Sequence, residues 1–306
     1  MLERWWMYQQ QRFSLFKWGG FAAVFSGAAV LHSLLLRRSF PAETNAFSAA
    51  HAIGAVLIAF LVVFLCCLQL RIVDEVSLFK QRCVQSDASM SNQLTTDLEV
   101  IAVAAGIMQF GLTLALGHLS LLLVLGSVWG YLGLIHQAFF VPTWLRANPL
   151  PKTLLRAGLC PLITLYATGC DWLIASQAPP GGIIWFLLVS LFAAIAADIG
   201  CLIHAPTDAV PGSQTYTALW GRERAVVVWL GILWLLSITS LLAGMQIQFT
   251  TAIALLLPFL SVGAVIVAWR YHSRPVQKRA QFGWITEVWI VSVYVSLGIV
   301  PFVLQT

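Results

Sequence analysis

Residues 182–203 read GIIWFLLVSLFAAIAADIGCLI, and the run contains a single charged side chain, Asp198. A helix that crosses a bilayer needs about 20 mostly apolar residues, so this run is long enough to span a membrane. Comparable apolar runs recur along the whole chain. The nine expected spans are Trp18–Leu36, His51–Leu70, Leu98–Leu116, Leu119–Phe140, Leu154–Ser176, Gly182–Ile203, Ala225–Leu242, Ile247–Trp269 and Trp284–Leu304.

The composition excludes most other classes of protein. Of the 306 residues, 59% are hydrophobic and only 9% are charged, whereas soluble domains are about a quarter charged. The apolar content is too high for a disordered chain, and six cysteines, most of them within apolar runs, are too few for a disulfide scaffold. The basic residues are spread singly, which argues against a nucleic-acid partner. We therefore expect one all-α domain, residues 1–306, built as a polytopic bundle of nine transmembrane helices.

The lysines and arginines predict the orientation of the bundle. With the N-terminus in the cytoplasm, nine spans place 15 of the 17 basic residues on the cytoplasmic side and only Arg37 and Arg38 on the other. Such a bias follows the positive-inside rule. It predicts a cytoplasmic N-terminus and a C-terminus on the opposite side of the membrane, which we expect to be a bacterial inner membrane.

Acidic side chains next to the spans predict a polar site. Asp74 and Glu75 follow the second span, Asp198 lies near the end of the sixth, and Asp208 follows it. Charge is costly in hydrocarbon, and all four acids belong to the predicted cytoplasmic face. Acids from two separate segments are suited to hold Mg²⁺ together with the oxygens of a phosphorylated ligand. Alternatively, they form ion pairs with arginines at the membrane surface.

Both acidic segments resemble motifs of a known family. Residues 198–208, DIGCLIHAPTD, and 211–221, PGSQTYTALWG, resemble the second aspartate-rich motif of the UbiA superfamily of intramembrane prenyltransferases. Residues 71–75, RIVDE, resemble the first motif of an atypical branch in which that motif is degenerate. Residues 140–146, FVPTWLR, and 161–172, PLITLYATGCDW, are similar to the same branch. The similarity extends from about the second span to the seventh.

The resemblance implies an enzyme that acts on an isoprenoid diphosphate among membrane lipids. Mg²⁺ would clamp the diphosphate, ionisation would leave an allylic cation, and prenyl transfer or cyclisation would follow, as in a prenyltransferase or a terpene cyclase. The expected metal ligands and catalytic residues are Asp74, Glu75, Asp198 and Asp208. The expected diphosphate contacts are Arg71, Lys80, Arg82 and Arg222. These residues fall in or beside two cytoplasmic motif loops, 71–97 and 204–223.

The chain departs from the family pattern in both motifs. Ser77, Leu78 and Gln81 stand where further acids follow the first motif, and Ala205 and Ala209 stand where acids are common in the second. One alternative is therefore a catalytically lapsed protein that binds a lipid or isoprenoid pigment, or serves as a subunit beside a membrane protein partner. A weaker alternative is a transporter that uses Asp171, an acid within the fifth span.

Overall fold

The computed structural model describes residues 15–39, 49–82, 88–174, 178–203, 216–273 and 280–305. In these ranges, nine helical segments are long and apolar enough to cross a membrane, and there are no strands. The predicted all-α membrane bundle is confirmed. The nine segments are Lys17–Arg38, Ile53–Ser77, Thr95–Ala115, Leu119–His136, Pro149–Trp172, Ile183–Leu202, Arg222–Gln246, Thr250–Ser273 and Gln281–Gln305.

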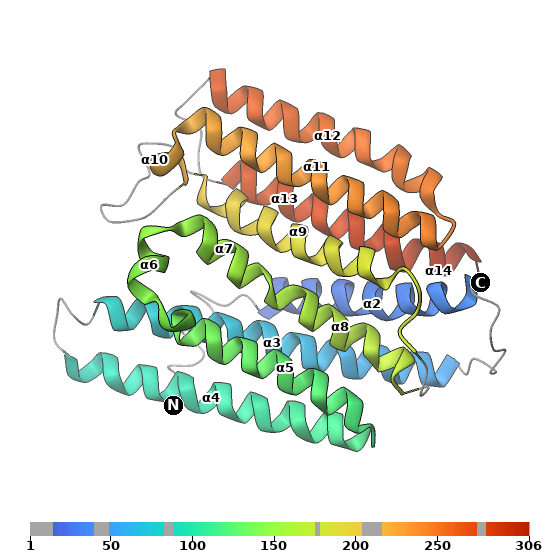
Figure 1. The fold of residues 1–306 in the computed structure, drawn as a ribbon, viewed down its shortest axis with the longest axis horizontal. Helices are drawn as coiled ribbons and strands as arrows, with labels where there is room; N and C mark the ends of the chain where they lie inside the picture. Colours follow the sequence, from blue (N-terminus) through green and yellow to red (C-terminus); the bar gives the residue numbers. More distant parts are fainter. Residues whose placement is uncertain are drawn as a thin grey trace.

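The long helices run roughly parallel to one another along the longest axis of the molecule (Figure 1). The long helices are α2 (Leu15–Ser39), α3 (Ala49–Arg82), α4 (Ala88–Ala115), α5 (Leu119–His136), α8 (Leu159–Trp172), α9 (Ile183–Leu202), α11 (Arg222–Gln246), α12 (Thr250–Ser273) and α13 (Ala280–Tyr294). The short elements are the 3₁₀ turn η1 (Ala138–Phe140), α6 (Pro142–Ala147), α7 (Pro149–Ala157), α10 (Tyr216–Trp220), the π-helical turn η3 (Val295–Ile299) and α14 (Val300–Gln305).

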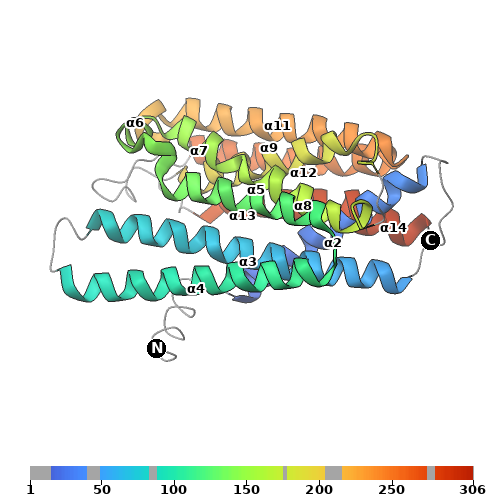
Figure 2. The same cartoon turned by 60° about the horizontal axis from the view of Figure 1, so that its bottom comes forward.

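Helix α9 packs against α11, α8 and α13, while α2 packs against α3, α8 and η3. Helices α4 and α12 lie at opposite edges of the bundle (Figure 1), and α3 and α4 form a long hairpin (Figure 2). We call the end at which α3 and α9 terminate and α11 begins the motif end. The other end of the bundle, here called the opposite end, carries the turn at Gly117 and the last residues of α14.

The first motif lies on a helix rather than in a loop. Residues 71–97 were expected to form a loop, but α3 continues to Arg82 and α4 begins at Ala88. The physical reason is that residues 71–82 contain neither glycine nor proline, and that Ile72 and Val76, four residues apart, are buried in one cluster with Leu98 of α4. The α3–α4 hairpin therefore extends the bundle at the motif end.

The chain between α5 and α8 also differs from the expected spans. The fourth span ends at His136, not at Phe140, because residues 138–140 take positive φ angles of 47°, 52° and 61°. The fifth begins at Pro149, and α7 and α8 meet at Gly158. Proline suits the first turn of a helix because its missing N–H has no partner there, and Pro142 and Pro149 open α6 and α7. These short helices bring the chain back over the motif end.

The second motif is described only in part. Of the expected loop 204–223, residues 204–215 lie outside the described ranges, residues 216–220 form α10, and Arg222 starts α11.

Side-chain hydrogen bonds between helices accompany the apolar packing. The hydroxyl groups of Thr113 and Tyr166 are 2.7 Å apart, and the Trp229 indole donates to Thr286 Oγ1 at 3.0 Å. Helices in lipid associate through close packing and such bonds, because the surrounding lipid is itself apolar. The contacts join α4 to α8 and α11 to α13, and so fix each of these pairs of helices in register.

Candidate functional site

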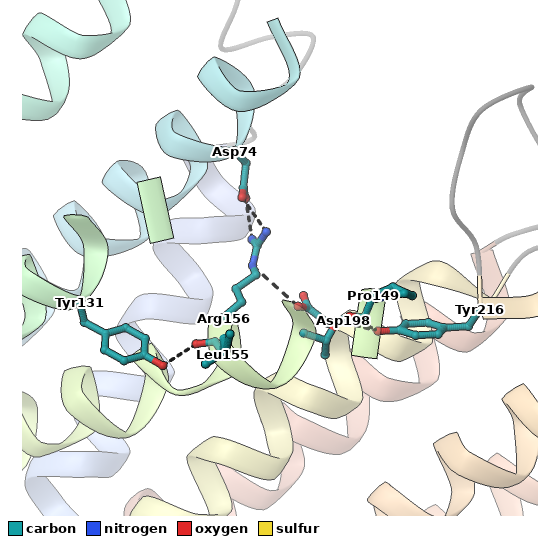
Figure 3. Close-up of polar contacts among 8 residues, drawn as sticks. Asp74, Tyr131, Pro149, Leu155, Arg156, Asp198 and Tyr216 are labelled. Carbon is teal, nitrogen blue, oxygen red and sulfur yellow. Dashed lines mark hydrogen bonds and ion pairs between the residues drawn. The ribbon is translucent and has the colours of Figure 1, made fainter. Parts of the chain in front are cut away.

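Three charged side chains from three helices meet at the motif end. Asp74 belongs to α3, Asp198 lies one turn before the end of α9, and Arg156 lies in the last turn of α7 (Figure 3). The two acids are far apart in the sequence and belong to the two different motifs. The expectation that the motifs converge is met by these two residues.

The guanidinium of Arg156 lies between the two carboxylates. Arg156 Nη1 donates to Asp74 Oδ1 and Nη2 to Asp74 Oδ2, both at 2.6 Å. Arg156 Nε lies 3.7 Å from Asp198 Oδ2. A planar guanidinium that donates two parallel bonds to one carboxylate is the strongest form of this pairing. Arg156 therefore joins the first motif to the second.

Helix α7 is anchored on two further sides (Figure 3). The Tyr131 hydroxyl of α5 donates to the Leu155 carbonyl at 2.6 Å, and a Cβ at Gly158 would lie 2.4 Å from that hydroxyl oxygen. Any larger residue at position 158 would displace this hydroxyl. The Tyr216 hydroxyl of α10 hydrogen-bonds Thr153 Oγ1 at 2.7 Å and the Pro149 carbonyl at 3.1 Å. These contacts fix the helix that carries Arg156.

Tyr216 remains a neutral hydrogen-bond donor. Burial raises the pKa of its hydroxyl above the ordinary value of 10, the bond with Thr153 opposes this change, and the charge of Asp198 adds to it. Because the raised pKa keeps the proton on the oxygen, the contact between α10 and α7 persists across the neutral pH range.

Glu75 and Arg71 form a separate pair. Arg71 Nη2 lies 2.9 Å from Glu75 Oε1, one turn apart on α3, and the Glu75 side chain is buried. Successive residues on a helix point in directions about 100° apart, so Glu75 does not share the direction of Asp74. The expected metal ligand Glu75 and the expected diphosphate contact Arg71 therefore neutralise each other.

Arg222 is directed toward α12. Its Nη2 donates to the Tyr271 carbonyl at 2.7 Å, and its guanidinium lies 4.8 Å from the centre of the Tyr271 ring. Both residues line a cavity of about 430 Å³, together with Glu223 and His272. These contacts of Arg222 involve neither Asp74 nor Asp198, so the described geometry does not place Arg222 at the same group as Arg156.

Three other expected residues cannot be placed at the site. Asp208 lies outside the described residues. Lys80 and Arg82 belong to the last turn of α3, but their side chains are likewise outside the description. Their roles stay predictions.

The described residues do not fit a Mg²⁺ ion. Mg²⁺ requires near-octahedral oxygen ligands at about 2.0–2.1 Å, but both carboxylate oxygens of Asp74 already accept hydrogen bonds from Arg156. Among the described side chains, no group of three or more His, Cys, Asp or Glu is arranged to hold a metal ion. For Asp74, the contacts correspond to the other interpretation of the sequence, in which the acids pair with arginine.

Sequence reasoning did not single out Arg156. It counted this arginine only as a basic residue of the cytoplasmic face. The available signal was its position just before the apolar run of residues 157–170, because a charge at the edge of a span needs a partner. The sequence does not say which of the acids is that partner.

Asp171 forms a buried cluster at the opposite end. Its carboxylate accepts a hydrogen bond from Ser33 Oγ at 2.8 Å and pairs with Arg37 of α2. The Asp171 side chain is fully buried. Sequence analysis offered Asp171 as the charge of a transporter; these contacts give it a structural partner on a neighbouring helix.

Replacing Asp171 with asparagine should lower the stability of the bundle by about 1–2 kcal/mol. Asparagine keeps an acceptor for Ser33 but removes the negative charge that pairs with Arg37, and the cost is limited because Arg37 is partly exposed and its long side chain reaches water. Thermal unfolding in detergent measures the change. An unchanged midpoint would show that the pair contributes nothing, and a change in ion flux in liposomes would support transport.

Comparison with known proteins gives the fold. No family model matches the sequence, and no curated protein matches it. Among solved structures, the chain is similar to the apo structure of a UbiA homologue from Aeropyrum pernix K1, with 12% sequence identity and a TM-score of 0.60. The match covers 90% of this chain and 96% of that one. The chain therefore has the UbiA-like fold, an all-helical membrane bundle.

Proposed function

We propose that this chain is an intramembrane protein of UbiA type that acts on an isoprenoid diphosphate, by prenyl transfer or by cyclisation. The observation that supports it best is the convergence of Asp74 and Asp198, one from each motif, at one end of a UbiA-like bundle. The substrate is amphipathic, with a long apolar tail and a multiply charged head group. The polar groups at the motif end suit the charged head group of such a molecule, and the apolar helices suit its tail.

The proposed chemistry uses groups of this chain. Heterolysis of the bond between the allylic carbon and oxygen gives an allylic cation and a diphosphate that keeps the electron pair. A fixed positive group stabilises charge that develops on the leaving group, and Arg156 is such a group at the motif end. The cation then bonds to an acceptor or to an alkene of its own chain, and a proton is lost. Asp74 orients Arg156 through the two 2.6 Å bonds.

The orientation in the membrane is part of the proposal. With 15 of the 17 basic residues on one side by the sequence count, the motif end faces the cytoplasm and the C-terminus lies on the opposite side. A bacterial inner membrane suits this arrangement. The diphosphate substrate would then enter from the cytoplasmic leaflet.

A second function is favoured by a specific observation. Arg156 is already paired with Asp74 and Asp198, and the charge of Lys152 also acts on Asp198. Cations that are already matched by carboxylates of the chain attract a diphosphate poorly. A catalytically lapsed protein that binds a lipid or isoprenoid pigment, or serves as a subunit beside a membrane protein partner, accounts for this charge balance.

Pyrophosphate release distinguishes the two functions. The purified full chain is incubated with prenyl diphosphates of several lengths, with and without Mg²⁺, and the products are analysed by mass. We expect release that falls about 100-fold in Asp74→Asn, because a misplaced catalytic group costs that much, and also falls in Asp198→Asn.

Glu287→Gln is the matched control. Glu287 pairs with the exposed Lys17 at 2.7 Å, and this substitution removes the same charge. Its release should equal that of the wild type. Absence of release with every substrate, from a folded protein, would contradict the enzymatic proposal and favour the lapsed protein.

A further inference from the structure

The space between the two motifs is occupied by a side chain of the protein itself. Arg156 contacts Asp74 through both terminal nitrogens at 2.6 Å, and its third guanidinium nitrogen lies 3.7 Å from Asp198. A cation placed between two acidic helices is what a bridging metal ion would provide. We propose that Arg156 is a built-in cation that replaces a divalent metal between Asp74 and Asp198.

The chemistry of arginine makes this replacement permanent at neutral pH. A guanidinium is not deprotonated in proteins, so the positive charge stays between the carboxylates. An ion such as Mg²⁺ or Mn²⁺ has to displace two short charge-assisted hydrogen bonds and then remain close to a positive group. Both requirements lower the affinity of the wild-type site for a divalent ion.

The backbone that carries Arg156 is fixed. Tyr131 holds the Leu155 carbonyl, and Tyr216 holds Thr153 and the Pro149 carbonyl, so α7 is anchored before and beside Arg156. Thr153 and Ala157 are buried on the inner side of the same helix. Moving the guanidinium away from Asp74 would therefore require a rotamer change of Arg156 itself, because the anchored helix α7 does not carry it away. The cation belongs to the resting architecture of the site.

The contrast with Glu75 strengthens the assignment. Arg71 and Glu75 pair one turn apart within a single helix, α3. Arg156, in contrast, lies on a third helix and contacts acids of both α3 and α9. Bridging two helices through one central charge is the structural role of a metal ion in a two-motif site.

Manganese binding tests the replacement directly. Mn²⁺ is titrated into the purified full chain without a prenyl substrate, and bound ion is measured by electron paramagnetic resonance. We expect no binding by the wild type that depends on Asp74 and Asp198. In Arg156→Met, the two freed carboxylates should bind Mn²⁺ at least about tenfold more tightly than the wild-type protein does. This gain should disappear in Arg156→Met/Asp198→Asn.

Two control variants and a check of folding accompany this titration. Arg156→Lys keeps the positive charge and should bind no more Mn²⁺ than the wild type, while Glu287→Gln controls for loss of an acid from a separate, exposed pair. Circular dichroism and size-exclusion elution establish that each variant is folded.

Wild-type Mn²⁺ binding that weakens in both Asp74→Asn and Asp198→Asn would overturn the replacement, even where Arg156→Met does not fold. A folded Arg156→Met without any gain would also overturn it. Because no substrate is present, these results are separate from success or failure of the proposed prenyl chemistry.

Discussion

Replacing Gly298 with alanine should destabilise the bundle by about 3 kcal/mol or more, because overpacking at this position meets backbone rather than a movable side chain. A Cβ at Gly298 would lie 2.4 Å from Ala28 Cα and 2.5 Å from the Ala28 carbonyl oxygen. Helix α2 and the π-helical turn η3 would have to separate. Small residues at such crossings allow helix backbones to approach closely.

The geometry around Gly298 explains why separation is costly. Pro301 has no N–H to donate to the Leu297 carbonyl one turn earlier, and His32 Nδ1 of α2 donates to that carbonyl at 2.8 Å instead. Nδ1 carries the proton, since a carbonyl only accepts. Moving α2 away from η3 would stretch this bond between buried groups as well as the packing at Ala28.

Thermal unfolding in detergent, followed by the reaction of a thiol dye with the buried cysteines Cys66 and Cys170, measures the effect of Gly298→Ala. Gly231→Ala is the matched control, since a Cβ at Gly231, which lies within α11, meets nothing within 4 Å. Alanine should be neutral or slightly stabilising there. Equal midpoints for the two variants would show that the close approach of α2 and η3 is not needed.

Replacing Arg156 with methionine should cost about 3 kcal/mol of stability, at the lower end of the range for breaking a buried ion pair. Methionine keeps much of the length and the apolar contacts but leaves Asp74 and Asp198 without their shared cation. The cost is not larger because the side chains of Arg156 and Asp74 are 32% and 19% exposed, and solvent screens the charges left behind.

The individual contacts predict which substitutions lower the stability most. Asp74→Asn removes a bidentate partner and should cost about 2 kcal/mol, whereas Asp198→Asn removes one contact at 3.7 Å and should cost less than about 1 kcal/mol. In a double-mutant cycle, Arg156→Met/Asp74→Asn should cost less than the sum of its single variants, because the two residues share one interaction. Additive effects would show that Arg156 and Asp74 do not interact in the folded protein.

Much of the fold follows from the sequence because lipid imposes a simple requirement. Every backbone polar group in hydrocarbon needs an internal partner, so apolar runs such as residues 183–202 form helices whatever their neighbours are. Their number and order were therefore predictable from the positions of the apolar runs along the chain. The errors occurred at the ends of helices, where water can satisfy the backbone and local packing decides. Ile72 and Val76 extend α3 through a contact with Leu98 that is distant in sequence.

The candidate site was predictable only in part. Asp74 and Asp198 stood out because acids are rare in this chain and costly near lipid. The partner of Asp74 did not stand out, since Arg156 was one of many arginines assigned to the same face. Which cation meets which acid depends on the break at Gly158 and on the contacts of Tyr131 and Tyr216 with α7.

The sequence by itself determined that this protein is a bundle of membrane-spanning helices with acids from two motifs at one end, because hydropathy and the cost of buried charge act through local composition. Only the tertiary structure decided that an arginine lies between those acids. The direction of that side chain is set by contacts among helices far apart in the chain, and pairing energies of this kind depend on distances of a few ångströms that no linear pattern encodes.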